Sequence, residues 1–458
     1  MATTRLYRTQ GAGNRTKWTW SSWVKLATQS NDVSYWGQTL VCGYKASDNY
    51  TELALQNTGY MDFINVTNGS TDARLVTNRV FRDPTAWMHI VAVWDSSNGT
   101  AGDRMKIYVN GVEETSFSTD TNPSSGLESF INKSTHDIEI GSRAGGANYF
   151  NGAMAHTHFC DGYAYAASDF GETDATSGIW IPKSGPSVAY GTNGYFLKYA
   201  SGATGTDSSG ESNTMTVAGT ITSLKDNPEN NFCTLNPLDA NSYSSNSIKY
   251  TEVMNTVVAG GNNWKSTMST MAVTTGKFYF ETKIIGSSTN WWIGIIDPSQ
   301  IQYASGNMKY TDRTRGYAFN YTFDKGNSGS EVAWGYNTSI AQNDIVCVAV
   351  DITNSKIYAR KNGGAWANTS ASPAGDPTSG ATGTGSAYTL TQNNGQNIQY
   401  MPFVSSYSTT AKLSCNFGAG YFGTTAVASA GTNASGVGTF EFDVPTGYTA
   451  FSTKGLDI

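Results

Sequence analysis

The chain has 458 residues, enough for two or three domains, and it combines 49 glycines and 12% aromatic residues with only 14% charged residues. This composition is typical of strands and turns and argues against long helices. The net charge of -6 is spread thinly, without a basic run or a basic–aromatic stripe, which excludes the electrostatic footprint of a nucleic-acid-binding protein.

Neither a secretory signal nor a membrane span is apparent. The start of the sequence has no apolar core, and no run of about 18 apolar residues occurs anywhere. We therefore expect a chain made as a soluble cytosolic protein, without insertion into a membrane. Five cysteines, an odd number at wide spacings, give neither a disulfide framework nor a zinc pattern. We expect buried thiols and no cofactor.

The first strands are predicted from alternation and from one turn. Residues 17 to 27, KWTWSSWVKLA, alternate with the period of a half-buried strand. Residues 86 to 95, AWMHIVAVWD, are apolar on both faces, as in a central strand between two layers. Residues 105 to 117, MKIYVNGVEETSF, are predicted to form two strands joined at Asn110-Gly111, because Asn-Gly supplies the two positive-φ residues of a type I′ turn.

The composition changes in the middle of the chain. Gly, Ser, Thr, Asn and Pro dominate from about residue 184 to residue 235. We expect a first domain at residues 1 to 184, an ordered connector at 185 to 235 and a second domain at 236 to 458.

The second domain repeats a pattern of the first. DIVCVAVD at 344 to 351 is followed by SKIYARKNG, as HIVAVWD at 89 to 95 is followed by MKIYVNG. Each copy predicts a buried central strand, a polar reversal and a neighbouring strand that ends in an Asn-Gly turn. With the other short strands and turn clusters, this predicts an all-β chain of two antiparallel, jelly-roll-like β-sandwich domains joined by a Gly/Ser-rich connector.

These segments resemble known families. WMHIVAVWD, MKIYVNG and IEIGSRAGGANYFNGAMA resemble the strands of concanavalin A-like, laminin-G-type lectin domains. GKFYFET, WWIGIID, GYAFNY and DIVCVAVDITNSKIYARKNGGAW look like a SPRY domain. Segments such as GNRTKWTWSSWVK, SDFGETDATSGIWIPK and DNPENNFCTLNPLDANSYS look like the lectin-plus-SPRY proteins of marine bacterial viruses, which are labelled tail-fibre or virion-appendage proteins. The resemblance implies synthesis in the cytoplasm of a bacterial host and a place on the virion surface.

Candidate catalytic residues are few. Some concanavalin-like folds are glucanases whose carboxylates alternate along one strand, and Asp137 and Glu139 alternate in this way. Thr135 stands where that motif would begin with a carboxylate, and Gly141 and Ser142 follow where its last Glu is needed. Nucleophile-elbow and phosphate-loop motifs are missing from the sequence. We expect no catalytic residues and no enzyme.

Metal sites are equally weak in the sequence. His156 and His158 are predicted to share a strand face, but two histidines without a third ligand make a poor site. Asp48 and Asn49 supply oxygen ligands of the kind that calcium uses, without a recognisable loop motif. We expect no metal.

Aromatic residues in polar loops are the better indication of function. Sugar rings stack on Trp and Tyr while Asn, Asp and Ser groups meet their hydroxyls. In the second domain five aromatics stand at strand ends or in Gly/Ser/Asn loops and are the predicted ligand-binding residues: Trp291, Tyr303, Tyr310, Trp334 and Tyr336.

The sequence thus predicts a non-enzymatic virion-surface protein of a bacteriophage that binds a host cell-surface glycan or protein receptor. Contacts with other virion proteins, in a homo-oligomer or symmetric array, are expected as well. Two alternatives remain open: a structural protein that decorates or cements the capsid or tail, and a polysaccharide depolymerase.

Overall fold

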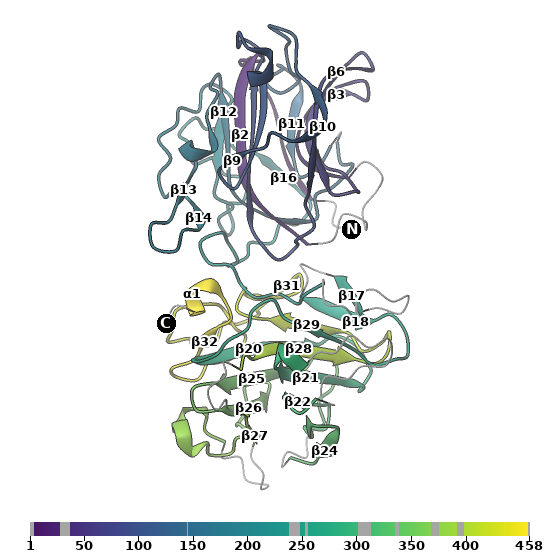
Figure 1. Cartoon of the computed structure of the whole chain (residues 1–458), viewed down its shortest axis with the longest axis vertical. Helices are drawn as coiled ribbons and strands as arrows, with labels where there is room; N and C mark the ends of the chain where they lie inside the picture. The colour runs from purple at the N-terminus through teal and green to yellow at the C-terminus, as the bar shows by residue number, and fades with distance from the viewer. Residues whose placement is uncertain are drawn as a thin grey trace. The chain divides into compact units, whose positions relative to one another are not determined.

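The chain divides into two compact units, unit 1 (Met1–Ser223) and unit 2 (Leu224–Ile458), in a computed structural model. The structure describes residues 4–27, 37–143, 145–237, 248–251, 255–300, 313–334, 339–367, 375–391 and 398–456. Almost all regular structure in these ranges is β (Figure 1), with a few single helical turns and α1 (Thr453–Leu456). None of the described helices is long and apolar enough to span a membrane.

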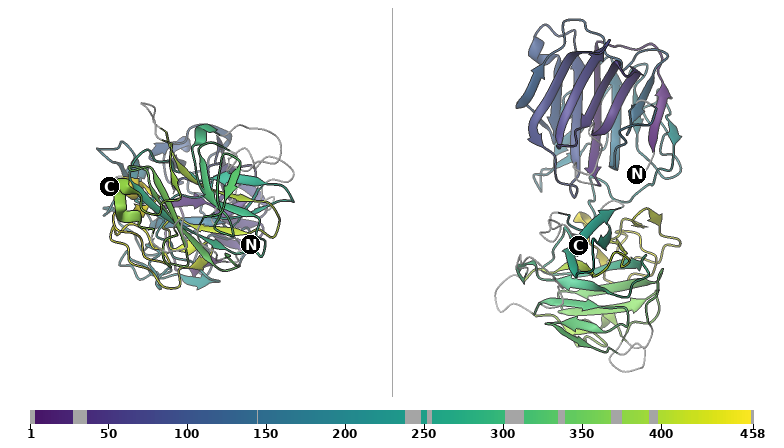
Figure 2. Two further views of the ribbon diagram at one scale, coloured as in Figure 1. Left: turned by 90° about the horizontal axis from the view of Figure 1, so that it is seen from below. Right: turned by 90° about the vertical axis from the view of Figure 1, so that its right-hand side faces the viewer.

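Unit 1 is a sandwich of two antiparallel sheets, whose strands are seen side by side in Figure 2. The eight-stranded sheet has the order β10 (Phe117–Thr121), β6 (Ser70–Val80), β5 (Tyr60–Thr67), β4 (Asn49–Leu55), β3 (Gln38–Ala46), β11 (Asp137–Ile140), β1 (Arg5–Thr9), β16 (Thr216–Ala218). The six-stranded sheet has the order β15 (Tyr195–Leu197), β12 (Gly152–Asp161), β2 (Lys17–Leu26), β7 (Met88–Asp95), β8 (Met105–Val109), β9 (Val112–Glu113).

The core of unit 1 lies between its two sheets. Trp18 and Trp94, on neighbouring strands of the six-stranded sheet, stack with ring centroids 6.3 Å apart. Phe63 of the other sheet meets Trp18 edge-on at 5.7 Å. All three side chains are fully buried. Burial of each such side chain contributes about 2 kcal/mol or more, so these strands hold the two sheets together.

Both faces of β2 are buried, whereas its alternating sequence predicted a half-buried strand. The outer face is covered by residues 162–192, a segment that we call the strap. The strap is tied to β2 through Thr19, whose hydroxyl donates to the Tyr163 carbonyl oxygen and accepts from the Tyr165 N–H, each at 2.9 Å. The strap includes the hairpin β13 (Gly171–Thr173) and β14 (Trp180–Pro182).

The segment predicted as a connector is divided between the units. Residues 185–223 belong to unit 1, where β15 pairs with β12 and β16 pairs with β1. Residues 224–235 belong to unit 2, where Phe232 bridges to Ser452. The Gly/Ser-rich sequence therefore contributes strands to the unit 1 sandwich.

Unit 2 is a second sandwich. One sheet has the order β17 (Ile248–Thr251), β18 (Thr256–Ala259), β29 (Leu413–Asn416), β20 (Lys277–Ile284), β25 (Ile345–Asp351), β26 (Lys356–Lys361), β27 (Tyr388–Thr389), and β32 (Thr449–Ala450) pairs in parallel with β20. The other has the order β19 (Lys265–Met268), β28 (Met401–Ser406), β21 (Trp291–Ile296), β22 (Gly316–Phe319), β23 (Lys325–Asn327), β24 (Ser330–Val332).

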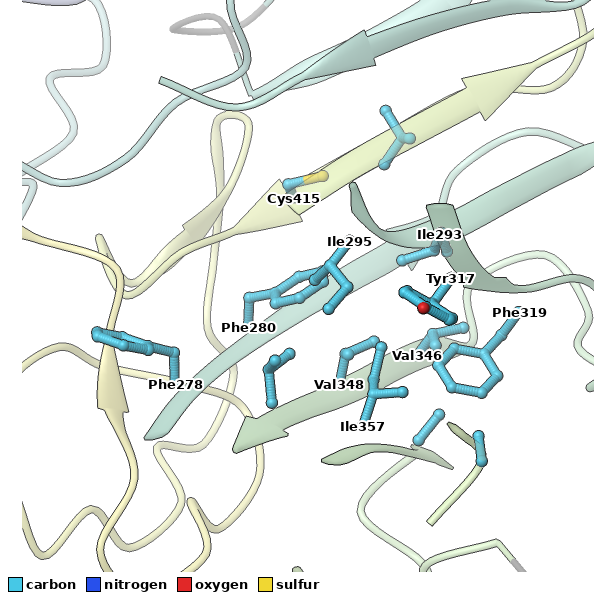
Figure 3. Close-up of a cluster of buried hydrophobic side chains, with 14 of the residues drawn as sticks. Phe278, Phe280, Ile293, Ile295, Tyr317, Phe319, Val346, Val348, Ile357 and Cys415 are labelled. Carbon is cyan, nitrogen blue, oxygen red and sulfur yellow. The ribbon is translucent and has the colours of Figure 1, made fainter. Parts of the chain in front are cut away.

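Alternate residues of these strands fill the core of unit 2. Figure 3 shows Phe280, Val346 and Val348 of one sheet facing Ile293 and Ile295 of the other, and all five are buried. The prediction of two antiparallel β-sandwiches is confirmed. All five cysteines are free and buried, as expected.

Candidate functional site

The outer face of the eight-stranded sheet of unit 1 carries aromatic and charged residues in two adjacent rows. The strand registers place one row as Tyr7, Glu139, Cys42, Glu52 and Ile64, and the other as Thr9, Asp137, Tyr44, Tyr50 and Val66. The residues that alternate with them, such as Leu6, Ile138 and Leu53, point into the core. We call these two rows the tyrosine face.

Glu139 anchors a loop on the tyrosine face. Its carboxylate accepts hydrogen bonds from Arg5 Nη1 at 3.0 Å, Ser142 Oγ at 2.5 Å and the Gly145 N–H at 2.6 Å. Gly145 has φ of 74°, a left-handed conformation that glycine adopts without strain. Only 2% of Glu139 is exposed, so the carboxylate is committed to holding the loop that follows β11.

Glu52 holds the same loop at a second point. It accepts from Thr39 Oγ1 at 2.5 Å and pairs with Arg143 Nη1 at 3.3 Å. Burial raises the pKa of Glu52, and the Arg143 charge and the Thr39 hydrogen bond oppose this rise. The Arg143 guanidinium also lies 3.9 Å from the centroid of the Tyr50 ring, a cation–π contact. One face of Tyr50 is therefore covered by the loop.

Glu52 and Glu139 are arranged for anchoring and not for glycoside cleavage. Since they lie on the strands that flank β3, their backbones are about 10 Å apart, two inter-strand spacings. A glycosidase needs one accessible carboxyl that gives up a proton to the sugar and one accessible carboxylate. Both carboxylates are at least 95% buried and already accept hydrogen bonds from an arginine or a hydroxyl.

Thr9 is exposed and Tyr7, Tyr44, Asp137 and Ile64 are half-buried, so these residues form the accessible part of the tyrosine face. Asp137 lies directly opposite Tyr44 in the register, and it accepts from Thr9 Oγ1 at 2.7 Å. Arg5 covers Tyr7 with its guanidinium 4.7 Å from the ring centroid. An aromatic ring beside a carboxylate and a hydroxyl is the combination that stacks on a sugar and binds its hydroxyls.

In a Ser–His pair of unit 1 the hydrogen bond runs in the wrong direction to activate the serine as a nucleophile. Ser21 Oγ lies 2.8 Å from His89 Nε2, and Trp180 Nε1–H donates to His89 Nδ1 at 3.0 Å. Because an indole nitrogen only donates, Nδ1 is the acceptor and Nε2 carries the proton. The imidazole therefore donates to the serine, whereas a catalytic base accepts the hydroxyl proton.

The predicted histidine pair does not form a metal site. His158 stacks on Phe196 with centroids 4.0 Å apart, and its Nδ1 is 2.9 Å from the Tyr190 hydroxyl. His156 has φ of 47° in a bulge of β12, which breaks the alternation that predicted a shared face. No cluster of three or more His, Cys, Asp or Glu residues suited to a metal occurs among the described residues. Asn49 Nδ2 donates to Asp48 Oδ1 at 2.8 Å.

The predicted aromatics of unit 2 do not form a surface site where the structure describes them. Trp291 is 1% exposed and Trp334 is 2% exposed, and both belong to the core of the sandwich. Trp334 packs against Phe319 with ring centroids 5.2 Å apart. Their polar sequence neighbours suggested loops, but these large rings fill the space between the sheets. Tyr303, Tyr310 and Tyr336 lie outside the described residues.

Comparisons with known proteins agree with the fold of unit 1. Residues 5–167 match the model of the concanavalin A-like lectin/glucanases superfamily. This is a lectin-type fold, which is suited to binding carbohydrate or protein. A search of curated proteins found none that matches the chain.

Among solved structures, the chain is similar to the SPRY domain of human HERC1, at 13% identity over 35% of this chain and 87% of that chain, with a TM-score of 0.25. It is also similar to a human SPRY domain, at 14% identity over 37% and 93%, with a TM-score of 0.25. A heptameric SAP-like pentraxin from Limulus polyphemus matches at 15% identity over 40% and 87%, with a TM-score of 0.28.

Proposed function

We propose that the chain is a non-enzymatic binding protein whose tyrosine face holds a carbohydrate. The observation that carries this proposal is the register that places Tyr44 beside Asp137 on an outer sheet face, where both side chains remain accessible. A pyranose ring stacked on Tyr44 would direct its hydroxyls to the Asp137 carboxylate and the Thr9 hydroxyl.

The biological setting that we propose is the surface of a bacteriophage virion, where the protein attaches the particle to a glycan of the host cell. The support for this setting is the resemblance of the sequence to lectin-plus-SPRY virion proteins. The lectin-type fold of residues 5–167 agrees with a binding role. Anchored carboxylates at Glu52 and Glu139 speak against a depolymerase.

The test is binding of the fluorescently labelled full chain to an array of bacterial surface polysaccharides. We expect selective binding to some polysaccharides, and Tyr44→Ala should weaken it about tenfold, in line with the loss of roughly 1.4 kcal/mol of stacking and contact energy. Tyr60→Ala is the matched control, because Tyr60 is a half-buried tyrosine on β5 of the same sheet, outside the two rows.

Three results would redirect the proposal. Binding that Tyr44→Ala and Tyr60→Ala leave equally intact would place the ligand elsewhere on the chain. No binding to any polysaccharide by the folded protein would favour the alternative of a structural component that decorates or cements the virion. Release of reducing ends from a bound polysaccharide would reveal a depolymerase.

A further inference from the structure

The strap covers the outer face of the six-stranded sheet of unit 1 (Figure 1). Its central part is fixed by apolar packing, since Phe170 and Ala167 of the strap are buried against Val91, Val93 and Cys160 of the sheet. The hairpin β13–β14 lies at the end of this cover. We call the hairpin, residues 171–182, the flap.

The base of the flap is buried at Gly171 and Pro182, and beyond this base Trp180 is the side chain with contacts to the six-stranded sheet. Most residues between its two strands are exposed, and Ile179 is 61% exposed. Trp180, the first residue of β14, is half-buried, because its ring packs against Gly111 and Gly171, where an added Cβ would come within 2.7 and 2.6 Å of the indole. Gly111, between β8 and β9, gives Trp180 a fitted place on the six-stranded sheet, and Gly171 contacts the ring from within the flap.

His89 receives Trp180 at this place. The Trp180 and His89 rings stack with centroids 6.0 Å apart, and Trp23 of β2 stacks on His89 at 5.0 Å. Trp180 Nε1–H donates to His89 Nδ1 at 3.0 Å, and His89 Nε2–H donates to Ser21 Oγ, 2.8 Å away. Both nitrogens of the neutral imidazole are therefore used, one as an acceptor and one as a donor.

This arrangement accepts only the neutral form of His89. A protonated imidazole carries N–H groups on both nitrogens, so Nδ1–H would point at the Trp180 N–H and the hydrogen bond that holds the flap would be lost. The groups that face His89 are Ser21 and Trp23 on β2, Trp180 on β14, and the titratable His156 and His158 on β12. Burial, with a smaller effect of His156, lowers the pKa of His89 to about 3 while the flap is closed.

We propose that the flap is an acid-released cover: protonation of His89 detaches Trp180 and lifts the β13–β14 hairpin off the sheet, uncovering the His89 ring on which Trp23 stacks. The apolar packing of Phe170 keeps the rest of the strap in place. Closed and open states differ in proton affinity, because an exposed histidine titrates near pH 6.5, so each pH unit below that value favours opening by up to tenfold. This goes beyond the proposed glycan binding, which uses the other sheet of unit 1.

The experiment follows Trp180 and Trp23 in the full chain labelled with 5-fluorotryptophan. Their fluorine resonances are assigned with Trp180→Phe and Trp23→Phe, and spectra are recorded from pH 7.5 to pH 4. We expect both resonances to move together as the pH falls, that of Trp180 toward a solvent-exposed position and that of Trp23 because its stacking partner His89 is uncovered. His89→Gln should abolish the change, because an amide oxygen accepts from Trp180 and an amide N–H donates to Ser21, and neither group titrates in this range.

Trp180→Phe supplies a test at neutral pH that does not depend on acid stability. This variant keeps an aromatic ring but lacks the N–H, so the Trp23 resonance at pH 7.5 should already lie near its acid position. Three results would overturn the proposal: unchanged resonances down to pH 4, the same acid change in His89→Gln, or an unaltered Trp23 resonance in Trp180→Phe.

Discussion

The side-chain oxygen of Asn110 accepts a hydrogen bond from the backbone N–H of His89 at 2.8 Å, and the Asn110 N–H donates to the His89 carbonyl at 2.9 Å. Asn362 makes the same two bonds with Ile345 in unit 2, at 2.7 and 2.9 Å. Each asparagine thus ties the hairpin turn to the start of a buried central strand. The Val-Ala-Val, Lys-Ile-Tyr and Asn-Gly pattern occurs twice in the sequence because both units form this central strand and this turn.

Substitutions at these turns should destabilise one unit at a time. Asn110 and Asn362 have φ of 49° and 46°, so alanine loses the side-chain bond and adds backbone strain, whereas glycine loses only the bond. We expect Asn362→Ala to lower the free energy of unfolding of unit 2 by about 2 kcal/mol, and Asn362→Gly by about 1 kcal/mol.

The measurement is urea unfolding of the full chain, followed by hydrogen exchange of peptides from each unit. It gives the stability of unit 1 and that of unit 2 separately. Asn110→Ala is the matched control, since it should shift the unit 1 transition instead. Equal shifts of both units by either variant would contradict the assignment of one turn to each sandwich.

Glu281 should make unit 2 less stable as the pH rises toward neutrality. Its carboxylate is fully buried and accepts from the Glu441 and Phe442 N–H groups and the Tyr279 hydroxyl. Burial nevertheless raises the pKa of Glu281 to about 7 from the ordinary value of 4.5. A raised carboxyl pKa stabilises the folded state fully below pH 4.5, and this contribution of about 3 kcal/mol is lost as the pH rises through 7.

The check is the urea midpoint of unit 2 at pH 5 and pH 7.5 in the parent chain and in Glu281→Gln. The variant should be less stable at pH 5, because its amide N–H meets a backbone donor, and its midpoint should change less between the two pH values. A pH dependence that the substitution leaves intact would assign the effect to another group.

His158 should make unit 1 less stable as the pH falls. Burial, then the charges of His156 and His89, hold the pKa of His158 well below 6.5. A lowered histidine pKa gives stability that is complete above pH 6.5 and is lost as the pH falls below it. In His158→Phe, which keeps an aromatic ring between Phe196 and Phe170, we expect a lower stability at pH 7.5 and a smaller loss on acidification. Thermal unfolding at pH 7.5 and pH 5 measures the stability at neutral pH and its loss on acidification. If His158→Phe loses as much stability on acidification as the parent chain, this account is contradicted.

The pair Arg143 and Glu52 tests whether the carboxylates of the tyrosine face are structural. Removing the guanidinium in Arg143→Met leaves a buried carboxylate without its partner, and we expect a loss of about 3 kcal/mol or more from unit 1. Arg143→Met combined with Glu52→Gln should recover part of this loss, because the buried charge is then absent as well. A double variant as unstable as the sum of the single ones would mean that the two side chains act independently.

The sequence predicted the architecture better than the site. Alternation and the Asn-Gly turns located the central strands, because burial and turn geometry are local properties of a few residues. Covering layers are not local: the strap buries the outer face of β2, which alternation alone assigned to solvent. The same limit explains why Trp291 and Trp334 were predicted to bind a ligand although they lie in the core. Their polar neighbours in sequence are not their neighbours in space.

The tyrosine face was missed for a related reason. Tyr7, Asp137 and Tyr44 come from three strands far apart in the sequence, and only the pairing of β1, β11 and β3 brings them together. Alternation of Asp137 and Glu139 on one strand was visible, but Thr135, Gly141 and Ser142 depart from the glucanase motif and no role was predicted for these carboxylates. Arg5 and the Gly145 N–H, which bind Glu139 and turn it into an anchor, become apparent only in the folded chain.

The most direct test of the central proposal is the affinity of the full chain for a polysaccharide selected from the array, compared among the parent, Tyr44→Ala and Tyr60→Ala by titration calorimetry. The account predicts a dissociation constant about tenfold higher for Tyr44→Ala and unchanged for Tyr60→Ala, with no consumption of the polysaccharide. Equal affinities for all three folded proteins would contradict the tyrosine face as the carbohydrate site.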